Sequence, residues 1–242
     1  MERIKATQRH ECCRTVAMSV IAIRHGETEW SLNGRHTGTT DLSLTDNGRR
    51  LAQELRLALS GRAFALVLVS PLQRARETCE LAGVAASARI EPDLVEWNYG
   101  KYEGLTPEQI HEQAPGWLIF RDGCPGGETP EQVGARADRV IARARAVEGD
   151  VALFAHGHVL RVLAARWLGL PAGAGQHFLL DTGTLSVLAH YREIPALKTW
   201  NAPLVGYVAR SLNEGSEVIC TATIPSEDAW TSSVDRVMGS SG

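Results

Sequence analysis

The chain has 242 residues, 44% hydrophobic and 22% charged, an ordinary globular composition at a length that suits one large domain. Its formal net charge of -3 gives no overall attraction for nucleic acid or for a membrane surface. No apolar run approaches the roughly 20 residues that span a bilayer, and the N-terminus lacks a signal-peptide pattern. The five cysteines suit neither a zinc site nor a disulfide framework. We therefore expect a cytoplasmic protein that binds neither nucleic acid nor membrane.

Three short apolar runs each end at polar residues that can carry chemistry. Such runs are typical of strands that are buried on both faces of a parallel sheet. The runs, each with the residues that follow it, are Ser19–Ile23 before Arg24-His25-Gly26, Phe64–Val69 before Ser70-Pro71, and Val151–Ala155 before His156-Gly157-His158. A further pair of short strands is expected within residues 179–188, around Thr182-Gly183-Thr184.

Helical patterns lie between the apolar runs, over residues 45–59, 72–81, about 129–147 and 159–168. The clearest start is Thr129, because Pro130 suits the first turn and Gln132 completes a capping box. Strands that alternate with helices predict an α/β domain with a mainly parallel sheet. We place this domain at residues 18–205, between an N-terminal extension of residues 1–17 and a C-terminal tail of residues 206–242.

Two of the predicted strands end in a histidine followed by glycine, at His25 and at His156. In open α/β sheets, ligands bind at the carboxyl ends of the strands, and glycine lets another group approach the backbone closely. A metal site is the rival use of His156 and His158. However, no nearby Cys, Asp or Glu completes a ligand set, and the neighbouring arginines would repel a cation. We therefore expect neither a metal nor another cofactor.

These strand ends carry a family resemblance that extends over roughly residues 18–203. Arg24-His25-Gly26-Glu27-Thr28-Glu29-Trp30 resembles the signature of the histidine phosphatase superfamily, the phosphoglycerate mutase-like proteins. Further matching segments follow in the family's order: 34–38, 44–48, 70–75, 96–100 and 155–158. Segments 97–104, 121–124 and 178–183 are most similar to the sedoheptulose-bisphosphatase-like and mycobacterial acid phosphatase branch. The resemblance implies a three-layer α/β sandwich around the mainly parallel sheet.

The resemblance also implies a phosphatase that acts through a phosphohistidine, with five catalytic residues. His25 would attack phosphorus as a neutral imidazole. Arg24 and Arg74 would clamp the phosphoryl oxygens, and His156 would donate to the same oxygens in the transition state. Glu96 would protonate the leaving alkoxide and then deprotonate the water that cleaves the phosphohistidine, so it must carry a proton before the first step.

A second group of residues is expected to contact the substrate. Several fall in the loop that wraps the substrate in this family, and Ser31 stands where mutases generally carry Asn. His158 could touch the far end of the substrate or cap the helix that follows it. Arg121 could reach a second phosphate, while the remaining histidines are expected at the surface or in the core. The predicted contacts are Ser31, Arg35, Thr37, Gly38, Tyr99, Arg121 and His158.

The preferred reading is a phosphomonoester hydrolase whose partner is a small sugar phosphate or acidic metabolite phosphate. A phosphoglycerate mutase-type phosphoryl transferase is one alternative, although no paired arginines for a substrate carboxylate stand between Glu96 and Trp117. A catalytically silent phosphate-binding module is another, but it should lack one of four residues that are all present here: His25, Arg74, Glu96 and His156. The sequence leaves a homodimer open.

Overall fold

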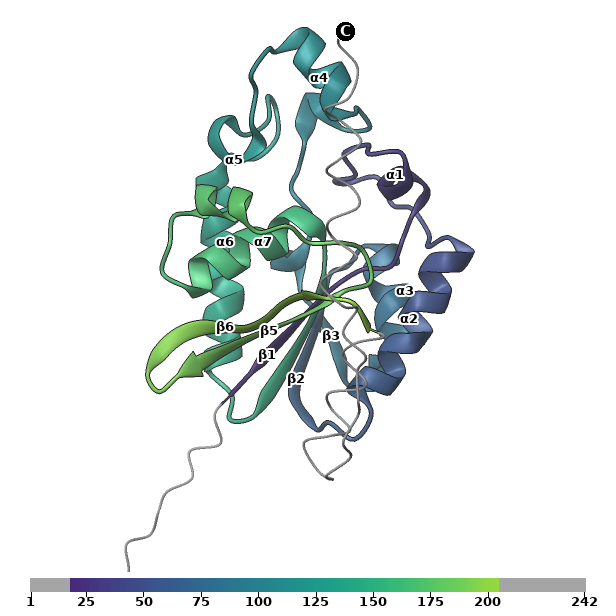
Figure 1. Cartoon of the computed structure of the whole chain (residues 1–242), viewed down its shortest axis with the longest axis vertical. Coiled ribbons are helices and arrows are strands. Elements are labelled where there is room, and N and C mark those ends of the chain that lie inside the picture. Colours follow the sequence, from purple (N-terminus) through teal and green to yellow (C-terminus); the bar gives the residue numbers. More distant parts are fainter. Residues whose placement is uncertain (1–17, 205–242) are drawn as a thin grey trace, which may run out of the picture. The chain divides into compact units, whose positions relative to one another are not determined.

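The computed structural model describes residues 18–204. Residues 1–17 and 205–242 lie outside the described part, and with them the predicted N-terminal extension and C-terminal tail. Within the described part, a six-stranded sheet runs in the order β3-β2-β4-β1-β5-β6 (Figure 1). The strands are β1 Val20–Arg24, β2 Phe64–Val69, β3 Ala88–Ile90, β4 Asp150–Ala155, β5 Leu185–Tyr191 and β6 Ile194–Ala202.

Helices cover both faces of the sheet, so the predicted three-layer sandwich is confirmed (Figure 1). In β1, Val20 and Ala22 face a core shared with α6 and α7, whereas Ile21 and Ile23 face a core shared with α2 and α3. This alternation places apolar side chains on both faces of one strand. The helices are α1 Glu29–Leu32, α2 Asp46–Leu59, α3 Gln73–Leu81, α4 Pro107–Gln113, α5 Ile119–Asp122, α6 Pro130–Arg145 and α7 Gly157–Trp167.

The four strands β3, β2, β4 and β1 are parallel to one another, while β5 pairs antiparallel with both β1 and β6. In the centre, β1 pairs with β4 in a register that sets Arg24 opposite Ala155. The residues that follow these two strands, His25 and His156, therefore emerge side by side at one edge of the sheet. The parallel part of the sheet thus brings together the strand ends that the sequence singled out.

Helix caps account for several of the element boundaries. Thr129 accepts a hydrogen bond from the backbone N–H of Gln132, whose side chain bonds back to Thr129, as the capping-box pattern predicts. Thr45 likewise caps α2 by accepting from the N–H of Gly48. These caps satisfy backbone donors that have no partner inside a helix, which explains why the helices begin at these residues.

Of the predicted pair of strands around residues 182–184, the second is confirmed by β5 and the first is wrong. Residues 178–184 contain no strand, β5 begins only at Leu185, and β6 was not predicted. The reason lies in the polar contacts of the segment, since the side chain of Asn201 accepts from the N–H of Asp181 and donates to its carboxylate. Arg192 takes the tight turn between β5 and β6 with φ 58°, a place where glycine usually signals a hairpin.

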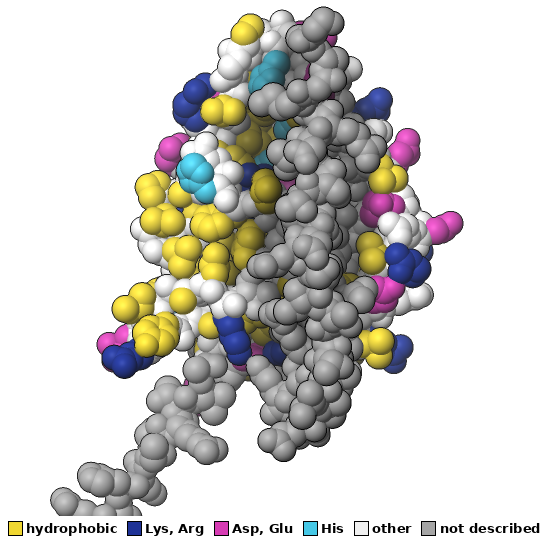
Figure 2. All heavy atoms as spheres, viewed as in Figure 1, with side chains coloured by type: hydrophobic (Ala, Val, Ile, Leu, Met, Phe, Trp, Pro, Cys, Tyr) yellow, Lys and Arg dark blue, Asp and Glu magenta, His cyan; other side chains and the backbone are white. Residues whose placement is uncertain are grey.

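Hydrophobic side chains gather on the side of the molecule where β6 and α7 lie (Figure 2). Large apolar side chains that are exposed in this region include Leu170, Leu179, Tyr191 and Ile194. Across residues 18–204, none of the helices combines the length and the apolar composition needed to cross a bilayer.

Candidate active site

A cavity of about 240 Å³ opens at the carboxyl ends of β1 and β4. Its wall is built from the end of β1, the loop after α1, the segment around Glu96, and the first turns of α7. Arginines and histidines dominate the polar lining, and among residues 18–204 Glu96 is the one carboxylate in it. The lining residues are Arg24, His25, Thr28, Ser31, Gly34, Arg35, His36, Thr37, Glu96, Tyr99, Pro107, Gly157, His158, Arg161 and Leu180.

The His25 ring is held in one tautomer by its own neighbour. Its Nδ1 lies 2.7 Å from the carbonyl oxygen of Gly26, and because a carbonyl only accepts, Nδ1 carries the proton. Burial, followed by the charges of Arg74 and Arg24, lowers the pKa of His25 well below its usual value. The ring is therefore neutral, and its Nε2 carries a free lone pair.

His156 lies beside His25, with 5.1 Å between the ring centroids and a 60° tilt between the rings. Its Nδ1 accepts from Nε of Arg74 at 3.1 Å, so its proton is on Nε2, which lies 2.7 Å from Oγ of Ser70. Burial is the main cause that lowers the pKa of His156, and the charge of Arg74 adds to it. Its imidazole is thus a neutral N–H donor with fixed orientation.

The two arginines of the predicted clamp differ in their surroundings. Arg24 lines the cavity and donates from NH1 to the carbonyl of Leu180, while its buried Nε has no partner within residues 18–204. Arg74 does not line the cavity, because its fully buried guanidinium donates to the carbonyls of Thr37, Gly38 and Thr40 as well as to His156. Arg24 is therefore the cation that faces the cavity beside His25.

Glu96 is buried, and its carboxylate lies at the N-terminus of α7. It accepts from the backbone N–H groups of Trp97, His158 and Val159 at 2.9 to 3.0 Å. The free N–H groups and the dipole of a helix N-terminus both attract an acidic side chain. These contacts fix the carboxyl group at the wall of the cavity that also holds His25.

The structure brings Ser31, Arg35, Thr37, His158 and Tyr99 of the predicted substrate contacts to the cavity wall. Ser31 donates its hydroxyl proton to the carbonyl of Thr28 and accepts from the same residue's N–H, which is capping chemistry. The phenol of Tyr99 lies 2.6 Å from Nδ1 of His158, so the two side chains orient each other.

Gly38 and Arg121 are not part of the lining of this cavity, although Gly38 lines a second cavity together with Glu96. The N–H of Gly38 bonds to both carboxylate oxygens of Glu103, and its carbonyl accepts from Arg74. Arg121 is exposed and pairs with the carboxylate of Asp122 and the carbonyl of Gly116. The backbone contacts of Gly38 thus fix the conformation of the loop, and the charge of Arg121 is paired with Asp122 at the surface.

The lining residues that sequence reasoning missed include two with basic side chains, His36 and Arg161. His36 was expected at the surface or in the core, yet its ring stacks on His158 with centroids 5.9 Å apart and 4° between the planes. Arg161 lies on α7 three residues after His158, a spacing that places both side chains on one helix face. That spacing was the available signal for Arg161, and the position of His36 inside the matching segment 34–38 was the available signal for His36.

Within residues 18–204, no group of three or more His, Cys, Asp or Glu side chains is placed to hold a metal ion. The cavity instead gathers Arg24, Arg35 and Arg161 against a single carboxylate. Such a lining attracts an anion, and guanidinium groups match the geometry of phosphate oxygens.

Comparisons with known proteins agree with this geometry. Residues 20–203 match the Histidine phosphatase superfamily (branch 1). The chain is 42% identical over 173 residues to an acid phosphatase of Mycobacterium tuberculosis, covering 69% of this chain and 84% of that protein. It is 39% identical over 185 residues to sedoheptulose 1,7-bisphosphatase of Saccharomyces cerevisiae, covering 62% of this chain and 67% of that protein.

Solved structures give the same result. A structure of an open reading frame from Mycobacterium tuberculosis superposes with a TM-score of 0.75 at 37% identity, covering 77% of this chain and 98% of that chain. Mycobacterial glucosyl-3-phosphoglycerate phosphatase, solved as a complex with VO3, superposes with a TM-score of 0.69 at 29% identity, covering 76% and 98%. The chain belongs to the histidine phosphatase superfamily, branch 1.

Proposed function

We propose that this chain hydrolyses small phosphomonoesters through a phosphohistidine formed on His25. The observation that carries the proposal is the neutral His25 ring, whose Nδ1–H is bound to Gly26 and whose Nε2 is free in a cavity lined by arginines. A free lone pair on a buried, oriented imidazole is what attack on phosphorus requires. Because Nδ1 is held by the backbone, the ring cannot turn without breaking that hydrogen bond.

In the first step, Nε2 of His25 forms a bond to phosphorus as the bond from phosphorus to the alcohol oxygen breaks. Arg24 stabilises the charge that spreads over the phosphoryl oxygens, since its buried Nε has no partner within residues 18–204. His156 packs beside His25, with 5.1 Å between ring centroids, and its Nε2–H is directed at Ser70. Donation of this N–H to a phosphoryl oxygen stays a prediction, which requires the N–H to leave Ser70. The leaving alkoxide takes a proton from Glu96.

In the second step, Glu96 takes a proton from water, whose oxygen forms a bond to phosphorus while the bond to Nε2 breaks. The products are inorganic phosphate, the alcohol and the original enzyme, so the proton on Glu96 is restored. Glu96 suits both steps because three backbone N–H groups hold its carboxyl group in one place.

The substrate class follows from the size and charge of the cavity. A volume of about 240 Å³ suits a small ester. Arg161 donates Nε and NH2 to the carbonyls of Gly175 and Gln176, and its guanidinium lies 4.5 Å from the Phe120 ring centroid. This anchored cation, together with Arg35 at the outer wall, favours a second anionic group on the substrate. We therefore propose a phosphorylated sugar or acidic metabolite, in keeping with the names of the relatives.

The proposal is tested by trapping the covalent intermediate. The chain is mixed with a sugar phosphate that carries a radiolabelled phosphate, and the reaction is quenched in alkali. A phosphohistidine is stable in alkali and is hydrolysed in acid. We expect an acid-labile label on the native chain and on His177→Ala, whose histidine is exposed, but none on His25→Ala. Turnover in His25→Ala at the native rate would overturn the proposal. Phosphate release that requires a bisphosphoglycerate primer would indicate a mutase instead.

The compartment and the oligomeric state belong to the same proposal. Cys79 and Cys124 are free and buried, which suits a reducing cytosol. We keep a cytoplasmic location and a homodimer as predictions, which fractionation and sedimentation of the full chain would test.

A further inference from the structure

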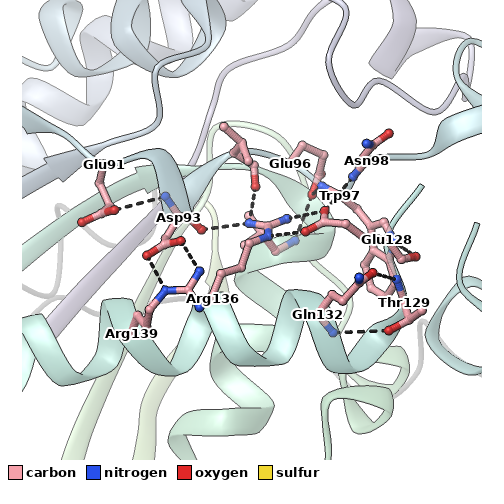
Figure 3. A network of polar contacts seen from close by, with 12 residues as sticks. Glu91, Asp93, Glu96, Trp97, Asn98, Glu128, Thr129, Gln132, Arg136 and Arg139 are labelled. Atoms are coloured by element: carbon pink, nitrogen blue, oxygen red, sulfur yellow. Dashed lines mark hydrogen bonds and ion pairs between the residues drawn. The ribbon is translucent and has the colours of Figure 1, made fainter. Parts of the chain in front are cut away.

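The segment that carries Glu96 has little regular structure of its own. It lies between the single-turn helices Pro92–Leu94 and Gly100–Tyr102, outside the sheet and the long helices. Its backbone polar groups therefore need partners other than a helix or sheet ladder. Figure 3 shows where those partners come from: the start of α6 and the residues before it face the segment with a network of charged side chains.

Arg136 holds the part of the segment that precedes Glu96. The residue is 5% exposed, and its NH1 donates to the carbonyls of Asp93 at 2.8 Å and Val95 at 2.6 Å. Nε and NH2 donate to the two carboxylate oxygens of Glu128 at 2.9 and 3.1 Å (Figure 3). Two carbonyls just before Glu96 are thus fixed by one cation, which Glu128 in turn holds in place.

Glu128 holds the part of the segment that follows Glu96. Its Oε2 accepts from the N–H of Asn98 at 2.9 Å, its carbonyl accepts from the indole of Trp97 at 2.9 Å, and its N–H donates to the carbonyl of Asn98 at 2.9 Å. Gly127 allows this approach, because a Cβ there would lie 2.1 Å from the carbonyl oxygen of Asn98. The pair therefore holds the chain on both sides of Glu96.

Neither Glu128 nor Arg136 lines the cavity that holds His25, and Glu128 lines a separate cavity with Glu96 and Asn98. We therefore assign the pair no contact with the group that His25 attacks. A buried ion pair contributes little net stability compared with apolar residues of similar volume, because both charges lose their hydration. Its geometric effect is larger, since two guanidinium hydrogen bonds hold the carbonyls of Asp93 and Val95, and Glu128 holds Trp97 and Asn98 on the other side of Glu96. A shift of about 1 Å in a catalytic group can reduce a rate about 100-fold.

We propose that Glu128 and Arg136 are positioning residues that hold the carboxyl group of Glu96 where it transfers a proton to the leaving group. This inference rests on the proposed function, since it assigns the pair to the proton-transfer step of that reaction. Loss of the pair should therefore slow the step in which an alkoxide leaves. It should leave the attack of His25 on phosphorus largely intact.

The test compares two esters that differ in their need for a proton. A nitrophenolate leaves without protonation, whereas the alkoxide of a sugar phosphate does not. The value of kcat/KM reports steps up to leaving-group release, so it excludes the later attack of water. For Glu128→Gln we expect kcat/KM to fall about 10- to 100-fold on the sugar phosphate and less than about threefold on nitrophenyl phosphate.

A matched control exists on the same helix. Arg166 donates from Nε and NH2 to both carboxylate oxygens of Asp138, at 2.9 Å each, and this pair does not contact the segment around Glu96. Asp138→Asn makes the same change from acid to amide in a bidentate pair, and we expect less than about a threefold effect on either ester. Arg136→Lys keeps the positive charge but loses the bidentate guanidinium group, so it should also lower kcat/KM more on the sugar phosphate than on nitrophenyl phosphate. It replaces Glu128→Gln in the test if that variant does not fold.

A double variant separates positioning from a general structural role. In a Glu96→Gln background, adding Glu128→Gln should reduce kcat/KM on the sugar phosphate by less than about threefold, because the proton donor is already lost. Equal losses on both esters in the single variant, or full additivity in the double variant, would overturn the inference. Failure of the proposed function is distinct, because then the native chain would hydrolyse neither ester, or His25→Ala would hydrolyse both.

Discussion

The rings of His36 and His158 stack almost parallel in the cavity wall, with 5.9 Å between centroids and 4° between planes. Burial is the main cause that lowers the pKa of each ring, and the same holds for His25 and His156. All four folded pKa values lie below the 6.5 of a free histidine. The folded cavity thus keeps its histidines neutral at pH values where the unfolded chain would protonate them.

This shift predicts a protein that loses stability as the pH falls. At pH above 6.5 both states hold the histidines neutral, so the stability is fully present. Below that value the unfolded chain binds protons that the folded chain does not, and the free energy of unfolding decreases by up to about 1.4 kcal/mol per histidine per pH unit. Urea unfolding across this range measures the slope. His158→Asn should flatten the slope, and a native stability that stays constant down to about pH 5 would contradict the prediction.

Arg161 provides a prediction about substrate choice. Arg161→Gln should raise KM for a sugar bisphosphate about 10-fold or more while changing KM for phenyl phosphate less than about threefold, because only the first ester has a second anion. Steady-state kinetics on the two esters measure this difference. Arg121→Gln is the matched control, since Arg121 lies outside the cavity and should leave both values unchanged. A larger effect from Arg121 than from Arg161 would refute the assignment.

Gly48 supports the residues beside His25 through a close backbone contact. A Cβ on Gly48 would lie 2.3 Å from the carbonyl oxygen of Glu27, so Gly48→Ala must push α2 away from the chain after His25. We expect the free energy of unfolding to fall by about 1 to 3 kcal/mol, although alanine normally favours a helix. Chemical denaturation measures this loss. Gln53→Ala, at an exposed position of the same helix, should change stability by less than about 0.5 kcal/mol.

Ser70 offers a test of how His156 is oriented. Its hydroxyl oxygen lies 2.7 Å from Nε2 of His156 inside the core, so Ser70→Ala leaves that N–H without its acceptor. We expect kcat to fall about 10-fold with a smaller change in KM, because the ring loses its fixed direction while the cavity wall keeps its shape. A variant of Thr78 is a useful comparison with Ser70→Ala, since the Thr78 hydroxyl accepts from the N–H of Gly26, next to His25, and does not contact His156. A change confined to KM in Ser70→Ala would argue against an orienting role.

Much of the site was predictable from the sequence because its residues directly follow buried strands. Buried apolar runs before His25 and His156 are local signals, and parallel pairing necessarily brings such strand ends to one edge of the sheet. The cap at Thr129 was equally local, since its hydrogen-bonding partner is three residues away. Features of this kind need no knowledge of distant contacts.

The missed features depend on contacts between distant segments. His36 reaches the cavity because the carbonyl of Leu105 accepts from its Nδ1, a contact across 69 residues that no pattern in the loop encodes. The family resemblance suggested a clamp at Arg74, but it did not reveal that backbone carbonyls take up that guanidinium. The sequence also did not reveal that Arg121 lies outside the cavity lining and pairs with its immediate neighbour Asp122 at the surface.

Two side chains of opposite charge bind the backbone of the loop of residues 37–40. Arg74 takes its carbonyls, and Glu103 takes the N–H groups of Gly38 and Thr40. Anyone who wishes to change the specificity of this protein by grafting a loop from a relative would therefore have to transplant the cation and the carboxylate with it. Since Arg74 also donates to His156, a loop graft that lost the contacts of Arg74 would change the orientation of His156 as well as the substrate specificity.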